Sequence, residues 1–475
     1  MLNQVKNFKD WQISVFIFIA TFFTRFVGIK NNSITSDESF SYFIINNSYS
    51  RILEATSNDV HPPLYYFITK GWMYFVGTSE FSLRLLSILL GSLAILAGYF
   101  LIRLFFDKAK SLLISLAIMF NPFLIYYSWE IRMYSLSLLL IISSTYFLMR
   151  IQTTLLKKYN KTLLIELIVL YSLSIGLALY THYFAFLVFF SQLIYIFKIY
   201  FEERKINSKI LLSLIVIPLI IFLPWLYTMT SQLARGQGLD WLTRSNFFTL
   251  SNSIFDYLST FSMVGWLSVA ILPFVAVFIF FIFKNYKKEY LLFYLIAFIP
   301  LLTVVAISFF RPIFHVRYLI YSSYFLTLIF LIAYFNSKAK YKNYLLALLL
   351  GLFLLGNIKL YLKPQKEYGQ IKSYIQSKNN GYKTFALEGS FTYLPVKYYF
   401  NNSEVLTGII KLNQEERFGK ILYDEYKYEN VKDLKKGYYW LVLRKEDKYL
   451  LESNDNVKVI SSKNFTSKTV LLIEK

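Results

Sequence analysis

The chain has 475 residues, of which 56% are hydrophobic, 20% aromatic and only 16% charged, and its mean hydropathy is +0.46. Ordinary soluble domains are about 45–50% apolar and about 25% charged, so this composition excludes a single soluble globule, and it is too apolar for a disordered chain. The net charge of +22 does not indicate nucleic acid, because lysines and arginines stand in short clusters between apolar runs, as in cytoplasmic loops. The absence of cysteine excludes disulfides, zinc–thiolate sites and cysteine nucleophiles. We therefore predict a polytopic, all-α membrane protein.

Eleven apolar segments are each long enough to span a bilayer, which requires about 17–25 residues. The first is not followed by a small-residue cleavage site, so we predict a retained helix rather than a signal peptide. With the N-terminus inside, the inner connections carry 19 of the 31 lysines and arginines that precede residue 364, in agreement with the positive-inside rule. The predicted spans are residues 11–30, 82–105, 111–128, 133–150, 162–181, 183–201, 210–227, 266–283, 290–310, 317–335 and 343–361.

Two predicted outer loops, residues 31–81 and 228–265, are long, and long loops carry function or fold into interfacial helices. After residue 363 the composition changes, since 33 of the last 112 residues are charged, against 45 of the first 363. Segments such as KTFALEG, GYYWLVLR and TVLLIEK alternate there with helix-like sequence, which predicts a small α/β domain. The predicted domains are a transmembrane domain, residues 1–363, and a soluble domain, residues 364–475. The odd number of spans makes the soluble domain extracytoplasmic.

The reactive side chains gather on the predicted outer face. All three histidines, and eight of the 14 acids among residues 1–363, fall in outer loops or at outer helix ends. A transporter is expected to place ionisable groups near the middle of its helices, but the main intramembrane acid, Glu166, lies near an inner end. No GxxxxGK[ST], GxSxG or HExxH motif is present. This distribution favours a reaction at the outer surface over passage through the membrane.

The first outer loop holds two groups of candidate residues. Asp37 and Glu38, in SITSDESFSYF, directly follow the first span, where a carboxylate in a dry site can act as general base on a hydroxyl. The alternative is an N-terminal helix cap. His61 in NDVHPPLYYF, with Asp59 two residues earlier, is presented by a stiff Pro-Pro pair and could contact a phosphate or ligate a divalent metal ion. The alternative is a capped turn before an amphipathic interfacial helix.

Three later segments also reach the outer face. In YYSWEIRMYSL, Glu130 and Arg132 stand at the start of a span, where snorkelling or a mutual ion pair explains them as well as function does. His182, in LYTHYF, lies between two spans. Cations on an outer face oppose the charge rule and therefore favour binding of an anion. The last segment, FFRPIFHVRYLI, places such cations at one outer edge with Arg311, His315, Arg317 and Tyr318.

The order of these segments resembles that of the GT-C glycosyltransferases, specifically the protein O-mannosyltransferase and aminoarabinose-transferase-like group. The most specific match is the first loop, where DE is followed some twenty residues later by DVHPPLYY. The segments WEIRMY, THYF and RPIFHVRYL look like those of bacterial and archaeal members, which implies a prokaryotic cell membrane. The resemblance covers about residues 10–362 and implies a membrane bundle of GT-C type.

In that family the donor is a sugar linked to a polyprenyl phosphate, and inverting transfer to an acceptor takes place on the outer face. The resemblance implies that Asp37 is the general base with Glu38 beside it. It also implies that His61 lies near the donor phosphate and that Arg132 is the arginine of the second outer turn. Relatives often have an acid five residues after that arginine, where this chain has Ser137. Either Glu130 replaces that acid or the acceptor differs, and the acceptor is a lipid, a glycan or a protein.

The chemistry of the residues agrees with this resemblance. Transfer from a lipid phosphate requires a base for the incoming hydroxyl and cations for the departing phosphate. A polytopic transporter or lipid-linked sugar flippase is the alternative from another class, although we find no internal repeat that supports it, and a ligase that transfers a whole glycan is a third reading. We predict that His61, Arg132 and Arg317 bind the donor phosphate, supported by Asp59, Glu130, His182, His315 and Tyr318.

Overall fold

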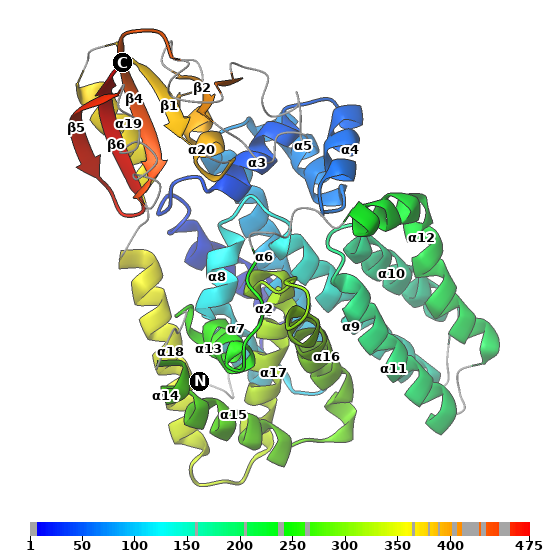
Figure 1. Cartoon of the computed structure of the whole chain (residues 1–475). Helices are drawn as coiled ribbons and strands as arrows, with labels where there is room; N and C mark the ends of the chain where they lie inside the picture. Colours follow the sequence, from blue (N-terminus) through cyan, green and yellow to red (C-terminus); the bar gives the residue numbers. More distant parts are fainter. Residues whose placement is uncertain are drawn as a thin grey trace. The chain divides into compact units, whose positions relative to one another are not determined.

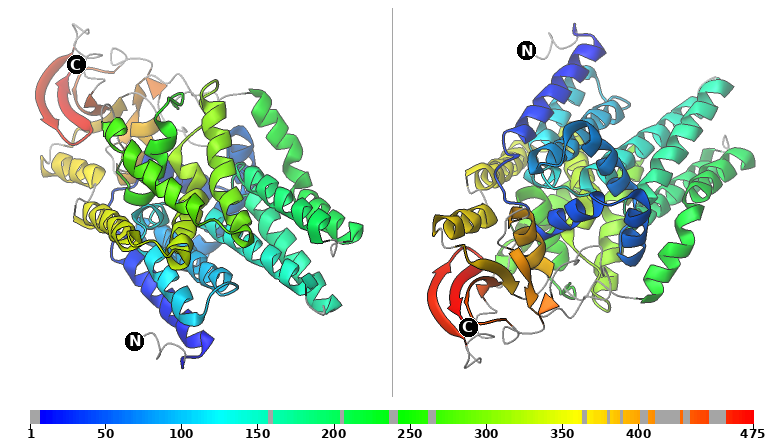
Figure 2. Two further views of the ribbon diagram at one scale, coloured as in Figure 1. Left: turned by 90° about the horizontal axis from the view of Figure 1, so that it is seen from below. Right: turned by 90° about the horizontal axis from the view of Figure 1, so that it is seen from above.

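The computed structural model separates the chain into two compact units (Figures 1 and 2). The helical unit comprises Met1–Gly28, Val60–Tyr65 and Arg84–Leu362, and the α/β unit comprises Ile29–Asp59, Tyr66–Leu83 and Lys363–Lys475. The residues that the structure describes are 7–156, 160–203, 207–235, 242–261, 267–362, 366–378, 381–387, 390–400, 406–410, 427–428, 434–445 and 457–475. Parts of the predicted loop 228–265 and of the tail 364–475 therefore lie outside the described residues.

The helical unit is a bundle in which the helices follow the apolar segments of the sequence. α9, α10, α11 and α12 lie side by side in both views of Figure 2. The helices are α2 (Asp10–Phe26), α6 (Glu80–Ile102, apart from its first turn), α7 (Lys108–Met119), α8 (Pro122–Ser128), α9 (Tyr134–Leu156), α10 (Lys161–Leu179), α11 (Ala185–Glu203), α12 (Ser208–Arg235), α13 (Thr249–Ser259), α14 (Leu267–Ala270), α15 (Leu272–Lys284), α16 (Leu291–Ser308), α17 (Ile320–Asn336) and α18 (Lys342–Leu362), with the 3-10 helices η1 (Lys288–Tyr290) and η2 (Val316–Leu319).

Within the described residues, nine helical segments are long and apolar enough to cross a membrane, or ten if α7 and α8 form one bent span. The predicted number was eleven. One difference is at residues 111–128, where the chain bends by 64° between α7 and α8. Asn121 caps α8 by accepting hydrogen bonds from two backbone N–H groups, and Pro122, which lacks an N–H, follows at the first helical position. The other is α2, which has only 17 residues.

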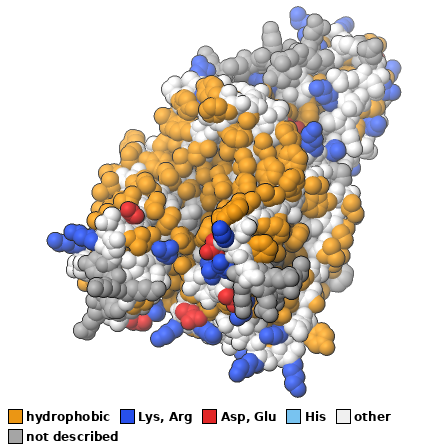
Figure 3. Space-filling view, turned by 180° about the vertical axis from the view of Figure 1, so that it is seen from behind, with side chains coloured by type: hydrophobic (Ala, Val, Ile, Leu, Met, Phe, Trp, Pro, Cys, Tyr) orange, Lys and Arg blue, Asp and Glu red, His pale blue; other side chains and the backbone are white. Residues whose placement is uncertain are grey.

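Helix α17 lies in the interior of the bundle, in contact with α7, α8, α9, α13, α15 and α16 (Figure 1). Its sequence is apolar on every side, which is typical of a buried helix, and its side chains are buried along most of its length. The peripheral helices instead expose apolar side chains, and Figure 3 shows a broad continuous apolar surface on one face of the molecule. Such a surface is suited to contact with lipid.

The α/β unit joins the first predicted outer loop to the tail. Its helices are α3 (Ser36–Ile45), α4 (Tyr49–Asn58), α5 (Leu64–Val76, apart from its first two residues), α19 (Glu367–Ser377) and α20 (Ser390–Phe400), and its strands are β1 (Lys383–Leu387), β2 (Leu406–Ile410), β3 (Lys427–Tyr428), β4 (Tyr438–Arg444), β5 (Lys458–Asn464) and β6 (Lys468–Glu474). The sheet order is β3-β2-β1-β4-β6-β5, with parallel pairing from β3 to β4 and antiparallel pairing beyond. The predicted small α/β fold of the tail is confirmed.

Alternation along β4 places side chains on the two faces of this sheet. Leu441 and Leu443 join a buried cluster with Leu471 and Ile473 of β6. On the other face, the ring of Trp440 meets Tyr374 of α19 edge-on at 5.9 Å between centroids. Helices α19 and α20 contact each other, and α20 also contacts β1, β2 and β4.

Two tyrosines of α20 hold the segments on either side of α3, α4 and α5. Tyr399 Oη accepts a hydrogen bond from the N–H of Ile34 at 3.1 Å and donates to the carboxylate of Glu80 at 3.2 Å. Tyr398 Oη accepts from the N–H of Glu80 at 3.2 Å, and its ring meets that of Tyr42 edge-on at 4.8 Å. The tail thus fixes the start of α3, the helix that carries Asp37.

Candidate functional site

Asp37 and Glu38 occupy the first turn of α3, and the structure gives the two carboxylates different settings. Thr35 is the N-cap, and its hydroxyl accepts the N–H of Glu38 at 3.2 Å. The Glu38 carboxylate accepts the N–H of Thr35 in return at 2.9 Å, so Glu38 completes a capping box and is almost fully buried. Asp37 is only partly buried and takes no part in that box. The cap predicted as the alternative role of this pair thus belongs to Thr35 and Glu38.

Asp59 is buried and ends α4 as its C-cap, in the α/β unit. His61 follows two residues later and belongs to the helical unit. The Pro-Pro segment after His61 is held by the N–H of Leu64, which donates to the carbonyl of Tyr180 at the end of α10. This bond brings His61 to the turn between α10 and α11.

Three rings from distant parts of the sequence meet in the helical unit and form a histidine cluster: His61, His182 and Tyr318. The ring centroids of His61 and His182 are 5.8 Å apart, those of His182 and Tyr318 are 5.1 Å apart, and those of His61 and Tyr318 are 6.2 Å apart. All three side chains are buried. His315 adjoins the cluster, with its ring 5.6 Å from that of Tyr318.

Two buried or partly buried arginines supply positive charge to this cluster. Arg132 lies in the turn between α8 and α9, close to buried Glu130, and Arg317 lies in η2 with its guanidinium carbon 5.8 Å from the centre of the Tyr318 ring. Burial first, and then the positive charge of His61, Arg132 and Arg317, hold the pKa of His182 well below its usual 6.5. His182 is therefore neutral at physiological pH.

The hydrogen bonding of His182 defines which nitrogen carries its proton. Nδ1 accepts the N–H of Phe184 at 3.2 Å, so in the neutral ring the proton is on Nε2. Nε2 is buried and has no hydrogen-bond partner within the described part of the chain. The ring thus offers a neutral N–H donor to a ligand.

A cavity of about 250 Å³, the histidine cavity, opens beside the cluster. It is mainly apolar with a few polar groups, as is usual for small-molecule sites. Tyr183 and Gln232, which were not predicted, belong to it and are joined by a hydrogen bond from Tyr183 Oη to the Gln232 amide oxygen. The lining residues are Val60, His61, His182, Tyr183, Phe184, Gln232, Leu233, Ile307, Arg311, Ile313 and Tyr318.

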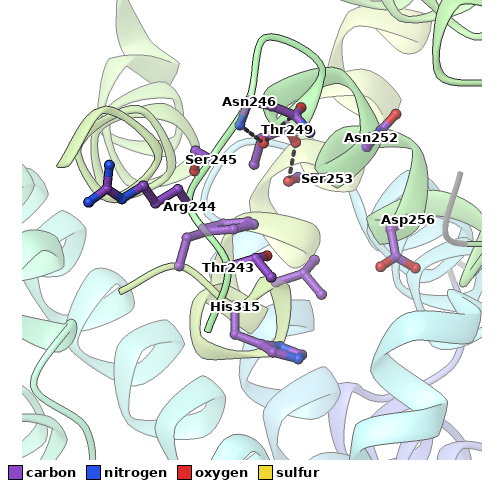
Figure 4. A pocket seen from close by; sticks show the side chains of 11 residues that line it. Thr243, Arg244, Ser245, Asn246, Thr249, Asn252, Ser253, Asp256 and His315 are labelled. Carbon is purple, nitrogen blue, oxygen red and sulfur yellow. Dashed lines mark hydrogen bonds between the residues drawn. The ribbon is translucent and has the colours of Figure 1, made fainter. Parts of the chain in front are cut away.

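A second cavity of about 320 Å³, the polar pocket, lies between residues 243–246, α13 and residues 314–316 (Figure 4). Burial raises the pKa of the Asp256 carboxyl from 3.8 to about 6, and the positive charge of Lys359 partly opposes this shift. The sequence offered no motif for this pocket; only the spacing of polar residues along α13 could have indicated it. Its lining residues are Thr243, Arg244, Ser245, Asn246, Thr249, Asn252, Ser253, Asp256, Phe314, His315 and Val316.

The structure thus brings together His61, His182, Arg132, Arg317 and Tyr318 in the helical unit, with His315 next to them. Asp37, Glu38 and Asp59 lie in the α/β unit. Over the described residues, no group of three or more histidine, aspartate or glutamate side chains is arranged to hold a metal ion.

Comparison with known proteins supports one fold and one class of enzyme. Residues 60–228, which include His61, Arg132 and His182, match the family described as dolichyl-phosphate-mannose-protein mannosyltransferase. None of the curated protein sequences is significantly similar to the chain. Among solved structures, ArnT from Cupriavidus metallidurans in the apo state is 14% identical, with a TM-score of 0.61 over 96% of this chain and 97% of that one.

The same ArnT bound to undecaprenyl phosphate is 13% identical, with a TM-score of 0.59 over 96% of this chain and 97% of that one. An oligosaccharyltransferase from Archaeoglobus fulgidus is 13% identical, with a TM-score of 0.49 over 88% of this chain and 65% of that one. The chain is thus an integral membrane protein with a GT-C fold like that of ArnT, and the match of its residues 60–228 to the mannosyltransferase family indicates a glycosyltransferase.

Proposed function

We propose that this glycosyltransferase moves a sugar from a polyprenyl-phosphate-linked donor to an acceptor hydroxyl on the outer face of a prokaryotic cell membrane, with inversion at the anomeric carbon. The observation that carries the proposal is the convergence of His61, His182, Arg132 and Arg317 on one buried cluster. The positive charges of Arg132 and Arg317 and the N–H donor of neutral His182, beside an apolar cavity, suit a lipid phosphate, whose head is anionic and whose tail is apolar. The ArnT structure with bound undecaprenyl phosphate supports the same class of donor.

The donor phosphate would be bound by His61, Arg132 and Arg317. Arginine suits this role because its planar fork can donate two parallel hydrogen bonds to one phosphate. His182 would add a neutral N–H donor from Nε2, since Nδ1 is engaged by the backbone. These groups neutralise the charge that grows on the phosphate oxygen as the bond to the sugar breaks.

Asp37 would act as the general base. Its carboxylate takes the proton of the acceptor hydroxyl while that oxygen attacks the anomeric carbon, and the electron pair of the broken carbon–oxygen bond stays on the departing polyprenyl phosphate. Direct displacement of this kind inverts the anomeric centre and requires no covalent intermediate. Glu38, engaged in the capping box, would keep the first turn of α3 in place.

The acceptor would be a lipid, a glycan or a protein, and the domain of residues 364–475 would stand on the extracytoplasmic side together with α3. The proposed transmembrane domain is residues 1–363. No observation favours a transporter or flippase.

Binding of undecaprenyl phosphate to the purified full-length protein tests the donor assignment. We expect Arg317→Ala, Arg132→Ala and His61→Ala each to weaken binding, and Arg317→Lys to restore it only in part, because a point charge cannot reproduce the bidentate fork. Arg51→Ala, which removes an exposed arginine of α4, is the matched control and should bind normally. Unchanged affinity in all three site variants would remove the assignment.

A further inference from the structure

The polar pocket is built on an unusual face of α13. Four polar residues are spaced at intervals of three, one and three, which places them on one side of the helix. They are Thr249, Asn252, Ser253 and Asp256. All four line the pocket, and Figure 4 shows their side chains around it. The opposite side of α13 buries Ile254, Phe255, Tyr257 and Leu258 in the bundle. The helix therefore directs its polar stripe to a cavity between segments of the protein.

The walls of the pocket are tied to one another. Ser308, at the end of α16, accepts the N–H of Ser245 on its carbonyl at 2.9 Å and the N–H groups of Ile313 and Phe314 on its hydroxyl at 2.9 and 2.7 Å. Tyr257 of α13 donates its hydroxyl to the carbonyl of Val316 at 3.2 Å. The pocket is thus a preorganised part of the helical unit, and its volume of about 320 Å³ lies at the lower end of the roughly 300–1,000 Å³ range of small-molecule sites.

The chemistry of the lining selects among ligands. Hydroxyl and amide groups that both donate and accept, with one carboxylate, match the hydroxyls of a sugar. A phosphate is disfavoured, because Asp256 would repel it and the guanidinium of Arg244 extends away from Asp256 in Figure 4. An isoprenoid is disfavoured, because it would bury these polar groups without hydrogen bonds.

One short segment separates the polar pocket from the histidine cavity. Phe314, His315 and Val316 line the polar pocket, whereas Ile313 and Tyr318 line the histidine cavity. The rings of His315 and Tyr318 are only 5.6 Å apart between centroids. A donor whose phosphate occupies the histidine cavity would therefore carry its sugar toward the polar pocket.

From these observations we infer that the polar pocket binds the sugar ring of the lipid-linked donor, through hydrogen bonds between the sugar hydroxyls and the side chains of Asn252, Ser253 and Asp256, of which the Asp256 carboxylate accepts. The inference rests on the proposed donor class and names the part of the donor that this pocket would recognise. An acceptor glycan has the same hydroxyl chemistry, and the closeness of the polar pocket to the histidine cavity favours the donor.

The test compares two ligands on the full-length protein: undecaprenyl phosphate, and undecaprenyl phosphate carrying mannose, glucose, galactose, N-acetylglucosamine or a pentose in turn. Wild type should bind at least one sugar-bearing ligand more tightly than undecaprenyl phosphate. Asn252→Ala, Ser253→Ala and Asp256→Asn should each reduce that gain by roughly tenfold, the loss expected for one buried hydrogen bond. Their affinity for undecaprenyl phosphate should be unchanged, which also shows that the variants are folded.

Ser251→Ala is the matched control, because Ser251 lies on α13, bonds the carbonyl of Phe248 and does not line the pocket. A gain that persists in all three pocket variants, or the absence of any gain in wild type, would overturn the inference. A rise in the KM for acceptor with donor binding unaffected would overturn the assignment to the donor. Failure to bind undecaprenyl phosphate at all would instead count against the proposed function.

Discussion

Asp37 and Glu38 are neighbours in the sequence, but they differ in what their carboxylates do in the first turn of α3. Glu38 accepts the N–H of Thr35 and is buried, whereas Asp37 lies outside the capping box. A carboxylate in a first helical turn is also favoured by the helix dipole. We therefore propose a chemical role for Asp37, whereas Glu38 has a structural role in the capping box.

Asp37→Asn should abolish most turnover while preserving donor binding. The amide keeps the size and polarity of the side chain but cannot accept the proton of the acceptor, and loss of a general base costs about 10²–10⁴-fold in rate. Glu38→Gln should be milder, because glutamine also completes a capping box. Sugar transfer by purified variants, normalised to undecaprenyl phosphate binding, measures the difference. Substantial activity in folded, donor-binding Asp37→Asn would assign the base elsewhere.

His182 should make the stability of the protein depend on pH. Its pKa is held well below 6.5 in the folded state, so below about pH 6.5 the unfolded chain binds a proton at this position that the folded chain does not. The free energy of unfolding should therefore fall as pH falls below about 6.5, by at most about 1.4 kcal/mol per pH unit. Thermal unfolding midpoints between pH 8 and pH 5.5 should decrease more in wild type than in His182→Gln. If the unfolding midpoint decreased equally in wild type and in His182→Gln, His182 would not be neutral in the folded protein.

At the scale of single elements, α18 approaches α8 and the end of α13 closely at one glycine. A Cβ atom on Gly356 would lie 2.6 Å from the carbonyl oxygen of Ser259 and 2.7 Å from Pro122 Cγ, whereas one on Gly351, in the same helix, would meet nothing within 4 Å. A hydrogen bond also joins α18 to the end of α13: the ammonium of Lys359 donates to the carbonyl of Thr260 at 2.6 Å. The close contact at Gly356 therefore supports the helix that lines the polar pocket.

Gly356→Ala should destabilise the protein by about 1–3 kcal/mol, the usual cost of overpacking. Gly351→Ala is the matched control and should be neutral or stabilising by up to about 1 kcal/mol, because alanine is the better helix former. Thermal unfolding of the two variants in detergent compares them directly. A Gly356→Ala variant as stable as Gly351→Ala would show that α18 can shift away from α13.

The periodicity of apolar residues predicts most helices and strands correctly. It does not predict which side chains from distant parts of the sequence come together in a pocket. The alternation in Tyr438–Arg444 predicted a strand, and β4 is that strand. The Asn121-Pro122 pair is a turn signal, but the apolar composition of residues 111–128 predicts one continuous span. The members of the histidine cluster were all predicted, since reactive residues stood together on one predicted face. The polar pocket was missed because serine, threonine and asparagine acquire a common direction only once α13 has formed.

At the scale of the whole molecule, the side of the membrane on which the tail lies is a direct test of the predicted topology. The chain contains no cysteine, so single substitutions report without background. Lys445→Cys, exposed at the end of β4, should react with an impermeant thiol reagent in intact cells. Lys209→Cys and Lys340→Cys, both exposed in predicted inner connections, should react only after the cells are broken. Protection of Lys445→Cys in intact cells would place the tail inside.

The bond between Tyr399 and the N–H of Ile34 joins residues 365 positions apart in the chain. At a synthesis rate of about 5–20 residues per second, roughly 20–70 s pass between the appearance of the two partners. During that interval the growing chain already contains α3 but lacks α20, the helix whose tyrosines fix the start of α3. The helix that carries the proposed base, α3, is thus synthesised early, but the hydrogen bonds that fix its start form only after α20 has been synthesised. Ribosome-bound chains should therefore be inactive until α20 has left the ribosome and folded.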